Sequence, residues 1–153
     1  MASTLKQRIE ADTKAALLGG DRFRGETLRN LKAAILNEEV AMGKRETGLD
    51  DGEVEKVLAR EVKKRNEAAA LYDQNMRQDS ADEERRESAI IAEYLPEQLS
   101  EAELKTIVDA KVAELDAAGD MKKMGAVIGA VKADAGNAGD GAMIAKLVKQ
   151  ALS

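Results

Sequence analysis

Apolar residues recur at every third or fourth position along almost the whole chain, which is the spacing of one face of an α-helix. Capping residues and glycines divide this pattern into segments of ordinary helical length. The pattern predicts four helices in the first part of the chain, two of them long, over about residues 3–18, 21–42, 50–72 and 80–95. It predicts three shorter helices behind them, over about residues 100–118, 120–135 and 140–152.

Pro96 is the one proline of the chain, and it marks the clearest domain boundary. A proline disfavours the helical conformation of the residue before it, so we expect the fourth helix to end at Leu95. Three short amphipathic helices joined by short loops are enough to form a small bundle. The sequence therefore predicts an all-α protein with a helical N-terminal domain, residues 1–95, and a C-terminal three-helix bundle, residues 96–153.

Helix starts are marked by side chains that can accept hydrogen bonds from the first free backbone N–H groups. Ser3 is expected to cap the first helix. Three further pairs have the spacing of a capping box, namely Asp50–Glu53, Ser80–Glu83 and Ser100–Glu103. The inward-facing stripes of the predicted helices include Val40, Leu71 and Leu115, which we expect to be buried.

The chain contains no histidine and no cysteine, which limits the chemistry expected of it. It has neither the usual general base near neutral pH nor the usual nitrogen and sulfur ligands of transition metals. We therefore expect no metal, no cofactor and no catalytic residues, and the absence of cysteine favours the cytoplasm. No apolar run approaches the length of a membrane span, so we expect no membrane association.

Two motifs have a partial likeness to known binding sites. Residues Gly20–Thr27 nearly form a phosphate-binding loop, but Glu26 stands where that loop needs lysine, and a predicted helix rather than a strand precedes it. We interpret this segment as a junction between two helices. The acidic run Asp79–Glu87 has no histidine to complete a carboxylate metal site, and carboxylates stabilise helix N-termini. We interpret the run as a solvated helix start.

Positive charge is concentrated at the end of the chain. The whole chain has a net charge of −5, whereas residues 121–153 carry five lysines against two aspartates. Basic groups on an acidic protein can meet phosphates, or they can form a solvated face. The candidate RNA contacts in this region are Lys122, Lys123, Lys132, Lys146 and Lys149.

Gly125 and Gly129 lie one helical turn apart in the same region. Their spacing favours close packing against a neighbouring helix, because small residues let backbones approach. The other interpretation is an exposed backbone open to a phosphate chain, and for that reason both glycines join the candidate RNA site.

A basic cluster is expected on the third predicted helix, made of Arg65 and a secondary basic patch on one face at Lys56, Arg60, Lys63 and Lys64. Glutamates interleave with these residues along the helix, so ion pairs within the helix are the favoured interpretation of this patch.

Several short segments, in this order and in a chain of this length, resemble the GatB/YqeY-domain family. They are Leu28–Ile35, Glu61–Arg65, Tyr94–Ser100, Met124–Gly129 and Asp140–Gly141. The strongest is Tyr-Leu-Pro-Glu-Gln-Leu-Ser at 94–100. The resemblance spans nearly the whole chain. It implies a relative of the tail of the B subunit of glutamine-dependent aspartyl/glutamyl-tRNA amidotransferase, which has a helical domain and a small three-helix domain.

In that enzyme the tail helps to recognise tRNA, whereas the chemistry belongs to a catalytic core that this sequence does not contain. The resemblance therefore implies a non-catalytic accessory module that binds tRNA or another folded RNA through its backbone phosphates. One alternative is a helical adaptor for a protein of the translation machinery. A further alternative is carbon–nitrogen ligase activity with glutamine as the amide donor, as part of an amidotransferase, and we expect no such activity from the chain alone.

The loop before the last predicted helix departs from the family pattern. Relatives usually carry Lys-Gly-Arg-Ala-Asp-Gly there, whereas this chain has Ala-Gly-Asn-Ala-Gly-Asp-Gly at 135–141. The glycines and the aspartate are kept, but both basic residues are absent. Because affinity for nucleic acid depends on the number of neutralised phosphates, we expect this change to weaken RNA binding.

Overall fold

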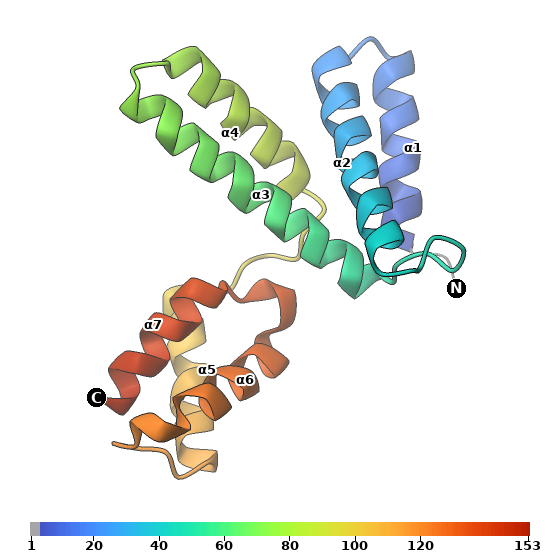
Figure 1. Cartoon of the computed structure of the whole chain (residues 1–153). Coiled ribbons are helices and arrows are strands. Elements are labelled where there is room, and N and C mark those ends of the chain that lie inside the picture. The colour runs from blue at the N-terminus through green and yellow to red at the C-terminus, as the bar shows by residue number, and fades with distance from the viewer. Residues whose placement is uncertain (1–3) are drawn as a thin grey trace. The chain divides into compact units, whose positions relative to one another are not determined.

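The computed structural model describes residues 4–153, and the regular structure in that range is helical throughout (Figure 1). The helices are α1 Thr4–Leu18, α2 Arg22–Ala41, α3 Asp51–Gln74, α4 Gln78–Ala92, α5 Glu101–Glu114, α6 Met124–Ala135 and α7 Gly141–Leu152, with short 3-10 turns at Met121–Lys123 and Gly136–Ala138. The predicted all-α class is confirmed. The predicted cap Ser3 lies outside the described residues.

The chain divides into two compact units, Met1–Leu95 and Pro96–Ser153. The first unit contains α1 to α4 and the second contains α5 to α7. Among the described helices, none combines the length and the apolar character that crossing a membrane would require.

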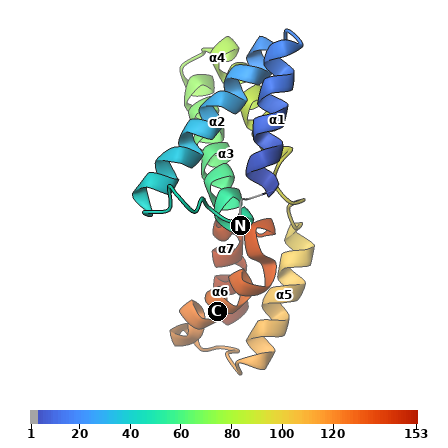
Figure 2. The same cartoon turned by 90° about the vertical axis from the view of Figure 1, so that its right-hand side faces the viewer.

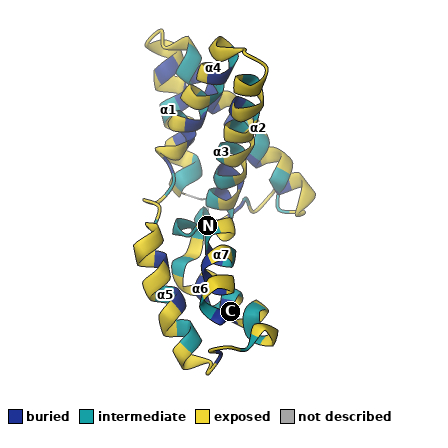
Figure 3. Cartoon of the chain, turned by 90° about the vertical axis from the view of Figure 1, so that its left-hand side faces the viewer, coloured by how far each residue is buried: buried dark blue, intermediate teal, exposed yellow. Residues whose placement is uncertain are grey.

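The N-terminal unit consists of two helical hairpins, α1–α2 and α3–α4 (Figure 1). Buried residues form a stripe along each helix (Figure 3), and the stripes of both hairpins meet in one aliphatic core. The core residues are Ile9, Leu28, Leu31, Ile35, Leu49, Val54, Val57, Leu58, Ile91 and Tyr94.

Within the segment Gly20–Thr27, Gly20 and Asp21 belong to the junction between α1 and α2, as interpreted from the sequence, and the rest forms the first turns of α2. Gly20 has a φ of 82°, a conformation that favours glycine, and it reverses the chain between the two helices. Asp21 then accepts a hydrogen bond from the Arg24 N–H at 3.2 Å and caps α2. The likeness to a phosphate-binding loop is therefore explained by a tight helix junction.

Glu39 is a buried carboxylate that links three parts of the N-terminal unit. Its exposed fraction is 1%, although it lies on an amphipathic helix. Lys6 Nζ of α1 donates to both of its oxygens, at 2.8 and 3.0 Å, and the Leu49 N–H donates to it at 3.1 Å. A buried carboxylate is tolerated when its oxygens are hydrogen-bonded, so α1, α2 and the α2–α3 connector are held together here.

Tyr94, which follows α4, links the α3–α4 hairpin to the α1–α2 hairpin. Its hydroxyl donates to Asp12 Oδ2 at 2.5 Å, and the guanidinium of Arg8 lies 4.6 Å from its ring centroid. Arg24 of α2 pairs with the neighbouring Glu93 at 2.7 Å. Burial, together with the hydrogen bond to Asp12, raises the pKa of Tyr94 from 10.0 to about 12.

In the C-terminal unit, α5, α6 and α7 pack against one another as a small bundle (Figure 2). Ser100 accepts a hydrogen bond from the Glu103 N–H at 3.1 Å and caps α5, and Asp140 accepts one from the Ala142 N–H at 3.1 Å and caps α7. The buried core residues are Leu104, Val108, Ala117, Val127, Val131, Ile144, Leu147, Val148 and Leu152.

Of the three predicted capping boxes, one is complete, one is half formed and one is wrong. At Ser100–Glu103 only the Ser100 side chain accepts a hydrogen bond, from the Glu103 N–H. Asp50 and Glu53 form the expected reciprocal pair at the start of α3. Ser80, by contrast, lies inside α4, which begins at Gln78 after Arg77 without a side-chain cap. The chain turns at Met76, which has a φ of 58°, and α4 has therefore already begun before Ser80.

Three residues expected in the core are exposed. Val40 is 58% exposed, Leu71 is 59% exposed and Leu115 is 38% exposed. Helical periodicity identifies the apolar face of a helix, but it does not show how far a neighbouring helix covers that face. Each of these residues lies on the apolar face of its helix, at a position that a neighbouring element does not fully cover.

Glutamine at position 39 would keep the size of the side chain and remove its charge. We expect Glu39→Gln to lower the free energy of unfolding by about 2–3 kcal/mol, because neutral hydrogen bonds replace the charge-assisted ones to a buried group. Chemical denaturation followed by circular dichroism measures the change. Glu38→Gln is the matched control, since that partly exposed ion pair should contribute less than about 1 kcal/mol. Equal losses in the two variants would contradict the role of Glu39.

The titration of Tyr94 gives a pH-dependent test. A raised pKa means that the folded state favours the neutral phenol, so this contribution to stability is complete below pH 10.0 and is lost as pH rises through about 12. In Tyr72→Phe, Tyr94 is the remaining tyrosine. We expect its tyrosinate absorbance to rise with a midpoint near 12. A midpoint near 10.0 in a chain that is still helical would show that the phenol is not held as described.

Candidate nucleic-acid interface

Helix α6 buries one face and leaves the other open. Val127 and Val131 are fully buried in the bundle core. Gly125 and Gly129 are exposed, and a Cβ atom added at either glycine would meet no heavy atom of another element within 4 Å. Close helix packing, the interpretation that the spacing favoured, is therefore wrong for both glycines within the described residues. The backbone of α6 is accessible along this face.

Four of the candidate lysines are exposed, and they lie on α6 and α7 or directly before α6. Lys122 precedes α6, Lys132 lies in the last turn of α6, and Lys146 and Lys149 lie three residues apart on α7. Within the part of the chain that the structure describes, the ion pairs of this unit are both on α5, Lys105–Asp109 and Lys111–Glu114. These four ammonium groups are therefore not neutralised by carboxylates of the described residues.

Lys123 has a different environment from the other four lysines. Its Nζ donates to the carbonyl oxygens of Leu115 and Asp116, at 3.0 and 3.1 Å. These carbonyls lie directly after α5, where a cation stabilises the negative end of the helix dipole. The ammonium group of Lys123 is thus partly occupied in stabilising the C-terminal end of α5.

Lys132 lies beside the start of α7. A Cβ atom added at Gly141 would lie 3.9 Å from Lys132 Nζ and 3.8 Å from its Cε. The structure therefore brings this ammonium group to the loop at 135–141, where this chain lacks the two basic residues of the family pattern. The sequence placed Lys132 on the sixth predicted helix, but no local signal showed that its side chain reaches the next helix.

The loop before α7 is held by the segment that follows Pro96. The Leu99 N–H donates to the Ala138 carbonyl at 2.8 Å, and Gln98 Nε2 donates to the Asn137 carbonyl at 3.1 Å. Gly139 is required by close approach, because an added Cβ would lie 2.8 Å from the Ala135 Cβ. The segment Tyr94–Ser100, which carried the family resemblance, is thereby connected to the loop that directly precedes Asp140–Gly141.

Charge in the C-terminal unit is divided between its helices. Residues 96–120, which include α5, carry seven carboxylates and two lysines. Residues 121–153, which include α6 and α7, carry five lysines and two aspartates. Such an arrangement attracts phosphates to α6 and α7 and repels them from α5.

The secondary basic patch on α3 has mixed pairing. Arg65 pairs with Glu61 on the same helix at 3.3 Å, as the favoured interpretation has it. Arg60 instead donates to Glu38 of α2 at 2.7 Å, so pairing within the helix is wrong for this residue. The exposed lysines of the patch that have no carboxylate partner among the described residues are Lys56, Lys63 and Lys64.

The acidic run Asp79–Glu87 lies in the first turns of α4, where it was expected. Arg85 pairs with Asp73 and Asp82, and Arg65 pairs with Glu87 at 3.2 Å. Among residues 4–153, no group of three or more histidine, cysteine, aspartate or glutamate side chains is arranged to hold a metal ion.

Comparison with known proteins agrees with the resemblance in the sequence. The chain is 31% identical over 91 residues to altered inheritance of mitochondria protein 41, mitochondrial, of Clavispora lusitaniae. The alignment covers 60% of this chain and 51% of that protein, so the chain spans about half the length of this curated relative. The Yqey-like protein family matches residues 6–152. Because that match covers nearly the whole sequence, the chain belongs to the YqeY-like protein family.

Proposed function

We propose that this protein is a non-catalytic accessory module that binds folded RNA, with tRNA as the first candidate. The observation that carries the proposal is the group of four exposed lysines on the α6–α7 segments, which have no carboxylate partners among the described residues. Membership of the YqeY-like family supports it, because the related amidotransferase tail is expected to recognise tRNA. The cytoplasm stays the proposed compartment, since a chain without cysteine suits a reducing environment.

The chemistry of this surface favours the RNA backbone over the bases. Each lysine can neutralise a phosphate, and the open backbone at Gly125 and Gly129 lets a phosphate chain approach closely. The aromatic residues of the chain, Phe23, Tyr72 and Tyr94, all belong to the N-terminal unit. Stacking on single-stranded bases therefore has no platform in the tail, whereas recognition of the shape and backbone of a folded RNA needs none.

Removing two of the exposed charges tests the proposal. We expect Lys122→Gln with Lys132→Gln to weaken binding of bulk tRNA roughly tenfold at low salt, and to reduce the slope of log affinity against log salt by about 2. Fluorescence anisotropy at about 50 and 200 mM salt measures both quantities.

The matched control is Lys105→Gln with Lys111→Gln, which removes the same charge from α5, where both lysines are ion-paired. This control should bind like the unmodified protein, apart from a small effect of net charge. An equal loss in the control would contradict the proposed site. Failure of the unmodified protein to bind tRNA at low salt would contradict the proposed function.

A further inference from the structure

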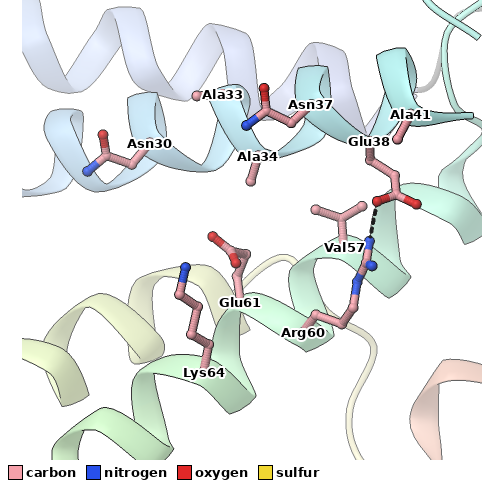
Figure 4. A pocket seen from close by; sticks show the side chains of 10 residues that line it. All are labelled: Asn30, Ala33, Ala34, Asn37, Glu38, Ala41, Val57, Arg60, Glu61 and Lys64. Carbon is pink, nitrogen blue, oxygen red and sulfur yellow. Dashed lines mark hydrogen bonds and ion pairs between the residues drawn. The ribbon is translucent and has the colours of Figure 1, made fainter.

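The open surfaces of the two units differ in charge. A groove of about 570 Å³ lies between α2 and α3, and the two glutamates that line it, Glu38 and Glu61, balance Arg60 and Lys64 (Figure 4). A lining without net charge does not select a partner by its charge. In the C-terminal unit, by contrast, the outward faces of α5 and α6 have unpaired charges of opposite sign beside them.

The outward face of α6 is made of small residues. Gly125, Gly129 and Ala133 are exposed and lie four residues apart along the helix, so they share one face. Val127 and Val131 are buried in the bundle core on the opposite side. Because no long side chain stands on this face, the backbone of another helix can approach it closely.

The unpaired charge beside this face is positive. Lys132 is exposed one turn after Gly129, and Lys122 is exposed directly before the helix. Neither lysine has a carboxylate partner among the described residues. Asp134, the acidic residue of α6, lies one turn after the buried Val131 and therefore away from this face. The surface around the α6 face thus attracts carboxylates.

Helix α5 has an outward face of the same kind. Ala102, Thr106 and Ala113 are exposed, on the side of α5 that lies away from the buried Leu104 and Val108. These short side chains also allow the close approach of another helix. The C-terminal unit therefore presents two helix faces that are open within the unit and have similar shapes.

The unpaired charge beside the α5 face is negative. Glu97, Glu101 and Glu103 are exposed at the start of α5 and have no basic partner among the described residues. The two lysines of α5 are already paired with carboxylates of the same helix, at 3.1 and 3.2 Å. The start of α5 thus complements the lysines beside α6, and both partners of such a contact are present in every copy of the chain.

We propose that the protein self-associates through these two faces, with α5 of one copy packed against α6 of the next. The small residues of both faces bring the helices close together, and the carboxylates at the start of α5 meet the ammonium groups beside α6 of the other copy. The contact joins two different surfaces, so it is heterologous and each copy can use both faces at once. Its charges are solvent-exposed, so the association is sensitive to salt.

Self-association uses the α6 face that is also proposed to bind RNA, so a second copy and an RNA compete for it. The contact itself needs no RNA. Loss of tRNA binding in the unmodified protein would therefore contradict the proposed function alone, whereas a chain that never self-associates would contradict this inference alone.

Sedimentation velocity of the full chain at rising concentration tests the inference. We expect the sedimentation coefficient to rise with concentration at about 50 mM salt and to return toward the single-copy value at about 500 mM. Lys122→Glu with Lys132→Glu, and Glu101→Lys with Glu103→Lys, should each weaken self-association at least about tenfold. An equal mixture of the two double variants should restore it, because their reversed faces complement each other.

Gly129→Leu tests the packing without a change of charge. A Cβ atom at this position meets no heavy atom of another element, so the variant keeps its own fold. The added side chain should hold the two helices apart and weaken self-association at least about tenfold, whereas unspecific apolar association would become stronger. Circular dichroism checks that the variant remains helical.

Lys14→Glu with Lys63→Glu is the charge-matched control, at two exposed lysines of the N-terminal unit. It should leave self-association within about threefold of the unmodified value. The inference is overturned if the sedimentation coefficient does not depend on concentration at low salt, if the mixture fails to restore association, or if Gly129→Leu associates as strongly as the unmodified chain. A control that loses as much as the double variants of α5 and α6 would overturn it as well.

Discussion

Glu39 lies near the end of α2 with 1% of its surface exposed, and its carboxylate accepts hydrogen bonds from Lys6 of α1 and from the Leu49 N–H. Because these donors come from separate parts of the chain, this one group fixes the path of the connector into α3. The neighbouring Glu38 pairs with Arg60 of α3 at 2.7 Å. Two adjacent glutamates of α2 therefore link this helix to α1, to the connector and to α3.

Most of the helical structure follows from local information, namely a period of 3.6 residues, capping side chains and Pro96. The sequence does not show how far each helix is covered by the helix that packs against it. Val40 and Leu71 continue apolar stripes, yet nothing local shows that their helices are left uncovered at those positions. Glu39 is missed for the opposite reason, because a glutamate on an amphipathic helix has the pattern of a solvated residue. Its hydrogen bonds come from Lys6 on another helix and from the Leu49 N–H of the connector.

The same distinction applies to the tail. Its basic residues are evident in the sequence, but their surroundings are not. Lys123 turns back to the carbonyl oxygens that follow α5, whereas the side chain of Lys132 lies beside Gly141 at the start of α7. Gly125 and Gly129 have the spacing of a packing face, and their exposure follows from the burial of Val127 and Val131 on the other side of α6.

The tail thus presents exposed ammonium groups beside the accessible backbone of α6. Mapping the amide signals of the ¹⁵N-labelled full chain by NMR during titration with bulk tRNA, at a concentration where the chain is a single copy, tests the RNA proposal most directly. The changes should be concentrated at Gly125, Gly129, Lys132 and Gly141, while the amides of α5 stay unaffected. Changes centred on α5, or no change in any amide at low salt, would contradict the proposed interface.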